Sequence, residues 1–525
     1  MSESRPWRVA LCAAALASAV PLWCAHFLPM ADLPQHVAAI GMLRHWFDPT
    51  WHLASRYALN AGDSQYFVYY AAGAALSFVT GSAETANRVL LTAAAIAFPY
   101  ALRSLLSAFG RDRRLALFGA PAFWSAPLMM GFAPYVAAVP LTIWALARFV
   151  REALAPSRRG RLLLSGIACL LFGLHISAYL LLVGCAAVLA PVLCEGAAAI
   201  TRSLSWVVPS AALAVAWALH FGVGAATGPS PETYTMAWTS AGTLASQLPL
   251  WAHDIWRSHV DEGCAAALWL ALLGLVFQRG TPPGDTRLSR AAWVPLAVAT
   301  LAYALLPYSV GPAVMLDMRM AAFVVLFVPL VLTPRPGLAG TLPLVAVLAS
   351  HLVGAADSAI EVHRTEAEEL GDFDRLLRQI PPDARVLTLP VHLTSKHTHW
   401  PPWVFLGSYH LARAGGEAEM SFTRIRHWPI RDTPGTAEQR RPLFWTLAPC
   451  TFRNAVDGPG VDYLLVRAPH DIFRAHPPGP SWRLLDRERE WFLYEREPGA
   501  EWVGADDPGP CTASDGSASP ATASN

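Results

Sequence analysis

The chain has 525 residues, of which 54% are hydrophobic and only 15% are charged. A soluble chain of this length would form roughly two to four domains with about 25% charged residues, so the composition argues against a cytosolic enzyme. The net charge of +1 gives no electrostatic basis for binding nucleic acid. The charges are unevenly spread, because residues 1–355 hold 21 Lys and Arg against 14 Asp and Glu, whereas residues 356–525 hold 18 against 24. We therefore expect a membrane-embedded part followed by a water-soluble domain.

A membrane-spanning helix needs about 20 mostly apolar residues, because the hydrocarbon core is about 30 Å thick. Hydropathy predicts eleven such spans in the first two thirds of the chain. They cover approximately residues 7–29, 84–105, 114–131, 134–151, 161–174, 176–196, 202–222, 263–279, 290–307, 319–333 and 338–355. The first is expected to be retained, because its apolar run from Val9 to Leu28 exceeds a typical signal-peptide core and no clear cleavage site follows.

Arg residues set the expected orientation, since basic loops stay on the cytoplasmic side. With the N-terminus inside, the inner loops hold 16 of the 21 basic residues of this region. Counting 66–80 as a further span would reverse this bias, so we expect that stretch to lie on the outer interface. The C-terminal domain then lies outside. The usage of 38 Arg against one Lys is typical of a high-GC genome, and a bacterial inner membrane is the expected location.

Three outer segments are long enough to build a site, namely residues 30–83, 223–262 and 308–320. In the first, apolar residues recur at helical spacing over 33–47, which predicts an amphipathic helix on the interface.

The water-soluble domain is expected to span residues 356–504. A helix reaching Gln379 and strands at 384–391, 462–467, 482–486 and 491–497 predict a small α/β fold, the last two strands forming a hairpin. The tail 505–525 is rich in Ser, Ala, Pro and Gly and is predicted to be disordered.

Asp32 is the main catalytic candidate, because it lies where the first span leaves the membrane and a carboxylate at that depth is costly unless it has a function. The alternative is that Asp32 only caps the helix that follows, with Pro34 in its first turn. His36 lies four residues later on the same helical face, where it could contact substrate, orient Asp32 or help to bind a divalent metal.

Several other residues are candidate substrate contacts. Asp317 and Arg319 lie together at the edge of the tenth span, where Arg319 could bind a phosphate. The alternative is that the two form only a surface ion pair. His175 interrupts an apolar hairpin and is either a buried structural histidine or a substrate contact. His253 and Arg257 could contact a charged ligand or lie in a solvated loop.

Other motifs are weak or missing. His397 and His399 resemble a metal-binding tract, but we do not expect these two histidines to share one metal. Cys450 and Cys511 could form a disulfide. No P-loop, dinucleotide-binding, hydrolase or kinase motif occurs, so chemistry driven by a cytosolic nucleotide is unsupported.

The arrangement resembles the GT-C class of membrane glycosyltransferases, which includes protein mannosyltransferases and aminoarabinose transferases. Three features carry the resemblance over residues 7–355: the acid Asp32 after the first span, two helices in the first outer loop, and the run Gly81–Arg88 followed by a span and the basic turn Arg111–Arg114. Many members carry two acids after the first span, whereas here Asp32 is followed by Leu33 and Pro34.

The resemblance implies a polyprenyl-phosphate-linked sugar donor, an extracytoplasmic acceptor, Asp32 as general base and Arg319 at the leaving phosphate. It leaves a divalent metal as an open question. Two other readings of the sequence are a lipid or sugar transporter and a non-catalytic membrane assembly protein that uses the outer domain to bind a partner.

Overall fold

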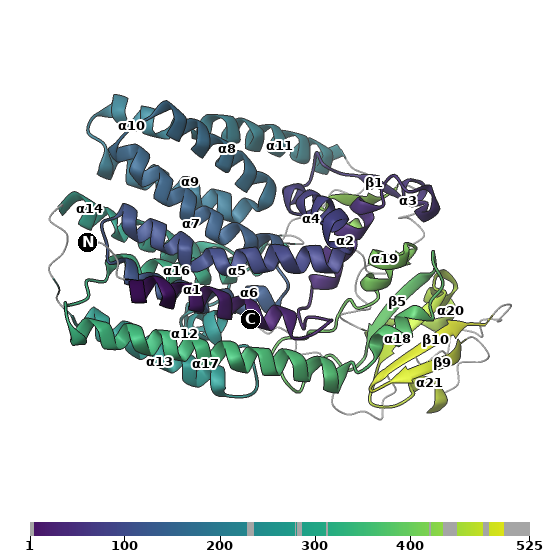
Figure 1. The fold of residues 1–525 in the computed structure, drawn as a ribbon. Helices are drawn as coiled ribbons and strands as arrows, with labels where there is room; N and C mark the ends of the chain where they lie inside the picture. The colour runs from purple at the N-terminus through teal and green to yellow at the C-terminus, as the bar shows by residue number, and fades with distance from the viewer. Residues whose placement is uncertain are drawn as a thin grey trace.

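The computed structural model describes residues 5–227, 236–278, 280, 286–310, 313–418, 422–433, 449–475 and 482–497. The predicted disordered tail, Cys511 and part of the second outer loop, residues 228–235, lie outside the described residues. Figure 1 shows a bundle of long, roughly parallel helices with a small sheet domain at one end.

The bundle is built from apolar helices that pack on one another. They are α1 (Arg5–Ala19) with η1 (Val20–Trp23), α5 (Ala83–Ala108), α7 (Ala133–Leu154), α8 (Arg158–Leu174), α9 (Ile176–Leu193), α10 (Ala197–Leu204), α11 (Val207–Thr227), α12 (Ala241–His253), α13 (Val260–Val276), α14 (Thr286–Ala291), α15 (Trp293–Leu305), α16 (Leu316–Phe327) with η5 (Val328–Val331), and α17 (Leu338–Glu369).

Six helices of the described chain are long and apolar enough to cross a bilayer, or seven if the bent pair Ala197–Leu204 and Val207–His220 counts as one span. The chain is therefore a multi-pass membrane protein, but the predicted number of eleven spans is not confirmed. The difference arises because α8 and α13 have only 17 residues each and α16 has 12, so these helices fall short of a full span by length or composition.

The prediction of a single helix over 114–131 is wrong. This stretch consists of η3 (Arg113–Gly119), η4 (Pro121–Phe123) and α6 (Ala126–Met129). Pro121 and Pro127 each remove a backbone donor, and the segment is almost wholly buried among other helices. Irregular backbone is tolerated at membrane depth when it is buried in protein.

The end of the bundle that meets the sheet domain carries α2 (Leu33–Arg44), η2 (Pro49–Trp51), α3 (Leu53–Arg56), β1 (Tyr57–Leu59) and α4 (Phe67–Thr80). The 14-residue α4 is too short to span a membrane, as predicted. The expectation of an amphipathic interfacial helix over 33–47 is wrong, because α2 ends at Arg44 and is buried on all sides from Leu33 to Met42. The soluble domain covers it through α19 (Ser408–Ala414): a Cβ on Gly41 would lie 2.5 Å from the carbonyl oxygen of Ala412.

The soluble domain is a five-stranded sheet in the order β6-β5-β8-β10-β9. The strands are β5 (Arg385–Pro390), β6 (Glu417–Ala418), β8 (Tyr463–Arg467), β9 (Trp482–Glu488) and β10 (Trp491–Arg496). β5 and β8 are parallel, and β9 and β10 form the predicted hairpin. Short elements connect them: α18 (Phe373–Arg378), η6 (Phe422–Arg424), β7 (Ile430–Asp432), η7 (Pro449–Thr451), α20 (Asn454–Asp457), η8 (Gly458–Gly460) and α21 (Ile472–Ala475). A further small sheet joins β2 (Met236–Ala237), β3 (Ser309–Val310) and β4 (Ala313–Val314).

The boundary at Ala356 is not a break in the backbone, because α17 runs unbroken from the membrane bundle into the soluble domain. The helix predicted to reach Gln379 instead stops at Glu369, and Gly371 takes a positive φ of 59° before α18 begins. At the end of α17, Glu369 is 3% exposed and accepts hydrogen bonds from Ser395, Lys396, Trp403 and Arg467. This buried carboxylate fixes the sheet to the helix.

Candidate functional site

Asp32 is held by backbone contacts to the loop between α6 and α7. The N–H of Ala31 donates to Met129 at 3.0 Å, and that of Asp32 donates to Met130 at 3.1 Å. Gly131 makes this approach feasible: its φ is +80°, and a Cβ there would lie 2.7 Å from the backbone nitrogen of Asp32. The position of the carboxylate is therefore set by two segments about 100 residues apart.

The carboxylate of Asp32 does not cap α2. No side-chain hydrogen bond to the helix start is present, and among the described residues no hydrogen bond to this carboxylate is found. Asp32 is half-buried, and burial raises its pKa to about 7, opposed by the positive charge of Arg319. An unpaired carboxylate with a pKa near neutrality has the properties of a general base.

Arg319 lies in the first turns of α16 and is 9% exposed. Its guanidinium lies over the ring of Phe132 at 4.6 Å, Nη2 donates to Val314 at 3.3 Å, and Nε is buried without a hydrogen-bond acceptor. The carboxylate of Asp317 instead accepts from Thr239 and from the N–H of Met318, and no ion pair with Arg319 is found among the described residues, so the alternative of an Asp317–Arg319 ion pair is wrong. Arg319 therefore presents a cation with unused donor capacity.

Aromatic and imidazole rings gather beside Arg319. The guanidinium of Arg319 lies within hydrogen-bonding reach of the Tyr66 hydroxyl. The ring of His175 lies 5.2 Å from Tyr66 and 5.1 Å from Tyr135, and its Nδ1 accepts from the N–H of Ser177 to cap α9. The ring of His427, from the soluble domain, lies 5.5 Å from Tyr66 on an edge-to-face contact.

His36 lies behind Asp32 and is 5% exposed. Its Nδ1 is 2.7 Å from the hydroxyl of Tyr70, and its ring also bonds to the backbone of Gly131. Burial lowers the pKa of His36 to about 3, so the ring is neutral at pH 7. These contacts tie His36 to Tyr70 and to the loop of Gly131, which also holds the backbone of Asp32.

An apolar cavity of about 600 Å³ begins next to this cluster. One part of the cavity is lined by Tyr69 and Leu174, which precede Tyr70 and His175 in the chain. Another part is lined by Arg103 and Ser104, near the C-terminal end of α5. The walls between are small or apolar side chains of α4, α5 and α7: Val68, Ala72, Leu90, Ala93, Ala94, Ala97, Tyr100, Ala101, Ala137, Pro140, Leu141 and Trp144. We call this cavity the α5 groove. Its size is typical of ligand sites.

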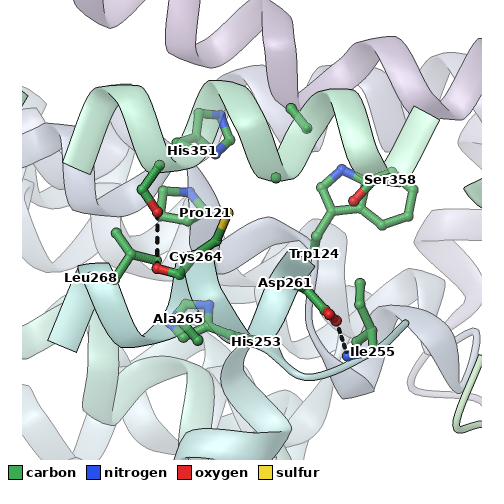
Figure 2. Close-up of a pocket in the computed structure, with 13 residues that line it drawn as sticks. Pro121, Trp124, His253, Ile255, Asp261, Cys264, Ala265, Leu268, His351 and Ser358 are labelled. Carbon is green, nitrogen blue, oxygen red and sulfur yellow. Dashed lines mark hydrogen bonds between the residues drawn. The ribbon is translucent and has the colours of Figure 1, made fainter. Parts of the chain in front are cut away.

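The structure brings Asp32, His36, His175 and Arg319 together but places the other candidates elsewhere. Asp317 is fully buried, and its carboxylate accepts from Thr239 and from the N–H of Met318. His253 lines a cavity of about 40 Å³ with Trp124 and His351 (Figure 2), which has room for a few water molecules. Arg257 bonds to the carbonyls of His397 and Thr398 and so ties the second outer loop to the soluble domain.

The residues of the His397–His399 tract do point to different partners. His397 pairs with Glu361 and Glu368, whereas His399 lies 3.3 Å from Asp254. Asp254, Glu262 and His399 bring one ligand atom each within 4.8 Å of one another, a set that could hold a divalent cation. Asp254 follows α12, Glu262 lies in the first turn of α13, and His399 belongs to the soluble domain, so this group is separate from Asp32.

Sequence reasoning missed His427 and Trp428. The ring of Trp428 lies 5.4 Å from His36 and 5.0 Å from Tyr70. No local pattern marks these residues, because their contacts with His36, Tyr66 and Tyr70 join segments more than 350 residues apart in the chain.

No protein-family model matches the chain, and no curated sequence is similar to it. Solved structures are similar in fold. The mycobacterial arabinofuranosyltransferase AftD matches with a TM-score of 0.53 and 16% identity over 97% of this chain, which spans 40% of the length of AftD. ArnT from Cupriavidus metallidurans, bound to undecaprenyl phosphate, matches with a TM-score of 0.52 and 11% identity over 95% of this chain and 99% of ArnT. The apo form of ArnT gives 0.51 and 12%.

Both proteins are membrane glycosyltransferases of the GT-C class, so this chain has a GT-C-like fold. The resemblance to the GT-C class stated from residues 7–355 is confirmed at the level of the fold.

Proposed function

We propose that the chain is a membrane glycosyltransferase that moves a sugar from a polyprenyl-phosphate donor to an extracytoplasmic acceptor, with Asp32 as general base. The observation that carries this proposal is the convergence of an unpaired carboxylate, an unpaired buried cation and the mouth of an apolar groove. A lipid-linked sugar phosphate accounts for the groove and for the cation, because its isoprenoid chain suits the groove and its phosphate suits Arg319.

In this proposal the isoprenoid chain of the donor lies in the α5 groove, and its phosphate lies beside Arg319, Tyr66 and His175. Asp32 removes the proton from an acceptor hydroxyl as that oxygen attacks the anomeric carbon. The bond from this carbon to the phosphate oxygen breaks, and the polyprenyl phosphate leaves with the electron pair. One displacement of this kind inverts the anomeric configuration and needs no covalent enzyme intermediate.

The test is sugar transfer by the purified full chain in nanodiscs, supplied with polyprenyl-phosphate-linked pentoses or hexoses and extracted envelope acceptors. We expect transfer by the wild type and a loss of at least a hundredfold in Asp32→Asn, since general-base catalysis contributes about 10²–10⁴-fold. Asp48→Asn is the matched control, because Asp48 lies in the same outer loop and Asn caps η2 as well as Asp does. Equal transfer by Asp32→Asn and the wild type would remove Asp32 from the mechanism.

A further inference from the structure

Residues 422–433 of the soluble domain, which we call the strap, lie over the first outer loop. Strand β7 of the strap pairs antiparallel with β1, and Tyr57 faces Asp432, Ala58 faces Arg431 and Leu59 faces Ile430. Because this register is fixed by backbone hydrogen bonds, the residues that precede β7 have a defined place beside the loop.

Asn60 positions the strap around His427. The side-chain amide of Asn60 donates to the carbonyls of Arg426 at 2.7 Å and Trp428 at 2.9 Å, the residues on either side of His427. The backbone N–H of Asn60 donates to Pro429 at 2.8 Å. One residue of the first loop therefore binds three carbonyls of the strap, two of them on either side of His427.

Trp428 anchors the strap on the inner side. Its ring is 5% exposed and packs on His36, Tyr70 and Phe422, and the N–H of Phe422 donates to the side chain of Gln35 at 3.1 Å. The arginines of the strap have acidic neighbours: Arg426 and Arg431 lie within 3.7 Å of Asp63, and Arg424 lies 3.7 Å from Asp432.

His427 is the strap residue whose ring reaches the Arg319 cluster. It is half-buried. Its ring lies 5.5 Å from the ring of Tyr66, and the ring of His175 lies 5.2 Å from the same tyrosine. The cluster at this point thus combines Arg319 from α16, His175 from the α8–α9 junction, Tyr66 from the first outer loop and His427 from the soluble domain.

We propose that His427 is a phosphate-binding residue of the active site, so that the soluble domain completes the donor site. This inference rests on the proposed function. The donor is a phosphodiester with one negative charge, whereas the leaving polyprenyl phosphate is a monoester whose charge approaches −2 at pH 7. Arg319 supplies one positive charge, and an imidazole N–H aimed at a phosphate oxygen stabilises the additional charge that develops as the bond breaks.

The first test measures binding of undecaprenyl phosphate and of undecaprenol to the full chain in nanodiscs, with His427→Ala and His363→Ala as matched variants. His363 is exposed on α17 and lies outside the site. We expect His427→Ala to weaken binding of the phosphate about tenfold or more while leaving undecaprenol binding unchanged, since hydrogen bonds to charged groups have effects of this size. His427→Gln, which keeps a donor, should recover part of the affinity.

The second test is the transfer assay described above. His427→Ala should lower kcat more than it raises KM for the donor, because the contact strengthens as the phosphate gains charge. Asn60→Ala should produce a smaller effect in the same direction, because it loosens the strap without removing the ring.

The outcomes separate the two proposals. If the wild type binds undecaprenol and undecaprenyl phosphate equally, the proposed donor class itself is wrong. If the wild type prefers the phosphate and His427→Ala keeps the full preference shown by His363→Ala, only the role of His427 is overturned. A variant that loses both ligands equally would show that the strap supports the fold and does not contact phosphate.

Discussion

At the scale of single residues, the site depends on a carboxylate in an unfavourable position. Asp32 has no donor within the described chain, and its pKa is raised to about 7 from an ordinary value of 3.8. A raised carboxyl pKa means that the folded state binds the proton more tightly than the unfolded state does. Ionisation of Asp32 therefore lowers stability as the pH rises from about 4 to 7, and the loss is complete above pH 7.

The upward direction of this pKa shift gives a prediction that separates function from stability. At pH 8, Asp32→Asn should raise the apparent Tm by a few degrees, because the variant no longer carries a buried charge, while sugar transfer is lost. At pH 4.5 the difference in Tm should nearly vanish. Thermal unfolding of both forms across this pH range is the measurement, and a lower Tm for the variant at pH 8 would contradict the assigned environment. Transfer by the wild type should fall as the pH drops below about 7, because the base becomes protonated.

Gly131 provides a second prediction at this scale. Its positive φ and the 2.7 Å approach to the backbone of Asp32 leave no room for a side chain. Gly131→Ala should reduce transfer at least tenfold by displacing Asp32, and should lower the Tm. The control is Gly196→Ala, since Gly196 also has a positive φ but a Cβ there meets nothing within 4 Å. Equal activities in the two variants would show that only local backbone strain matters.

At the scale of elements, the α5 groove exists because α5 presents small side chains toward α4 and α7. Ala94, Ala97 and Ala101 recur at helical spacing and line the cavity of about 600 Å³. The hydropathy of α5 predicts a span, but only the neighbouring helices decide which of its faces is covered and which forms a cavity.

Filling the groove should remove lipid binding without altering Asp32. Ala97→Phe should weaken binding of both undecaprenyl phosphate and undecaprenol about tenfold or more, since the isoprenoid chain loses apolar contact area in the filled groove. Ala187→Phe on the exposed face of α9 is the matched control. Binding assays in nanodiscs give the answer, and unchanged affinity in Ala97→Phe would place the lipid elsewhere.

At the scale of the whole molecule, the soluble domain is fixed to the bundle by α17 and by Glu369. This carboxylate is 3.0 Å from Arg467, and both side chains are almost fully buried. Removing one partner of a buried pair leaves an uncompensated charge at a cost of about 3–5 kcal/mol.

Glu369→Ala should therefore loosen the soluble domain from the bundle. We expect faster limited proteolysis near residues 370–384 and weaker binding of undecaprenyl phosphate, because His427 reaches the site only through this domain. Glu368→Ala, one residue away and half-exposed, serves as the control. Unchanged proteolysis and binding in Glu369→Ala would show that the strap and α19 hold the domain without this pair.

The sequence predicted several parts of this arrangement. Apolar runs long enough to cross a bilayer indicated a multi-pass membrane protein, the stretches read as strands match β5, β8 and the β9–β10 hairpin, and the position of Asp32 after the first span singled it out. The errors came from long-range contacts: α2 was expected to lie on the membrane surface but is covered by α19, and 114–131 was expected to be one helix but is broken at buried prolines.

What the sequence determined by itself is the membrane-embedded character of the chain, the soluble domain after it and the candidate acid, because these follow from local composition and the cost of burying charge. Only the tertiary structure decided that Arg319, His175, Tyr66 and His427 meet beside Asp32, and that His253 and Arg257 do not. Such meetings depend on how helices pack and on how the strap pairs with β1, and no local pattern encodes contacts between residues hundreds of positions apart.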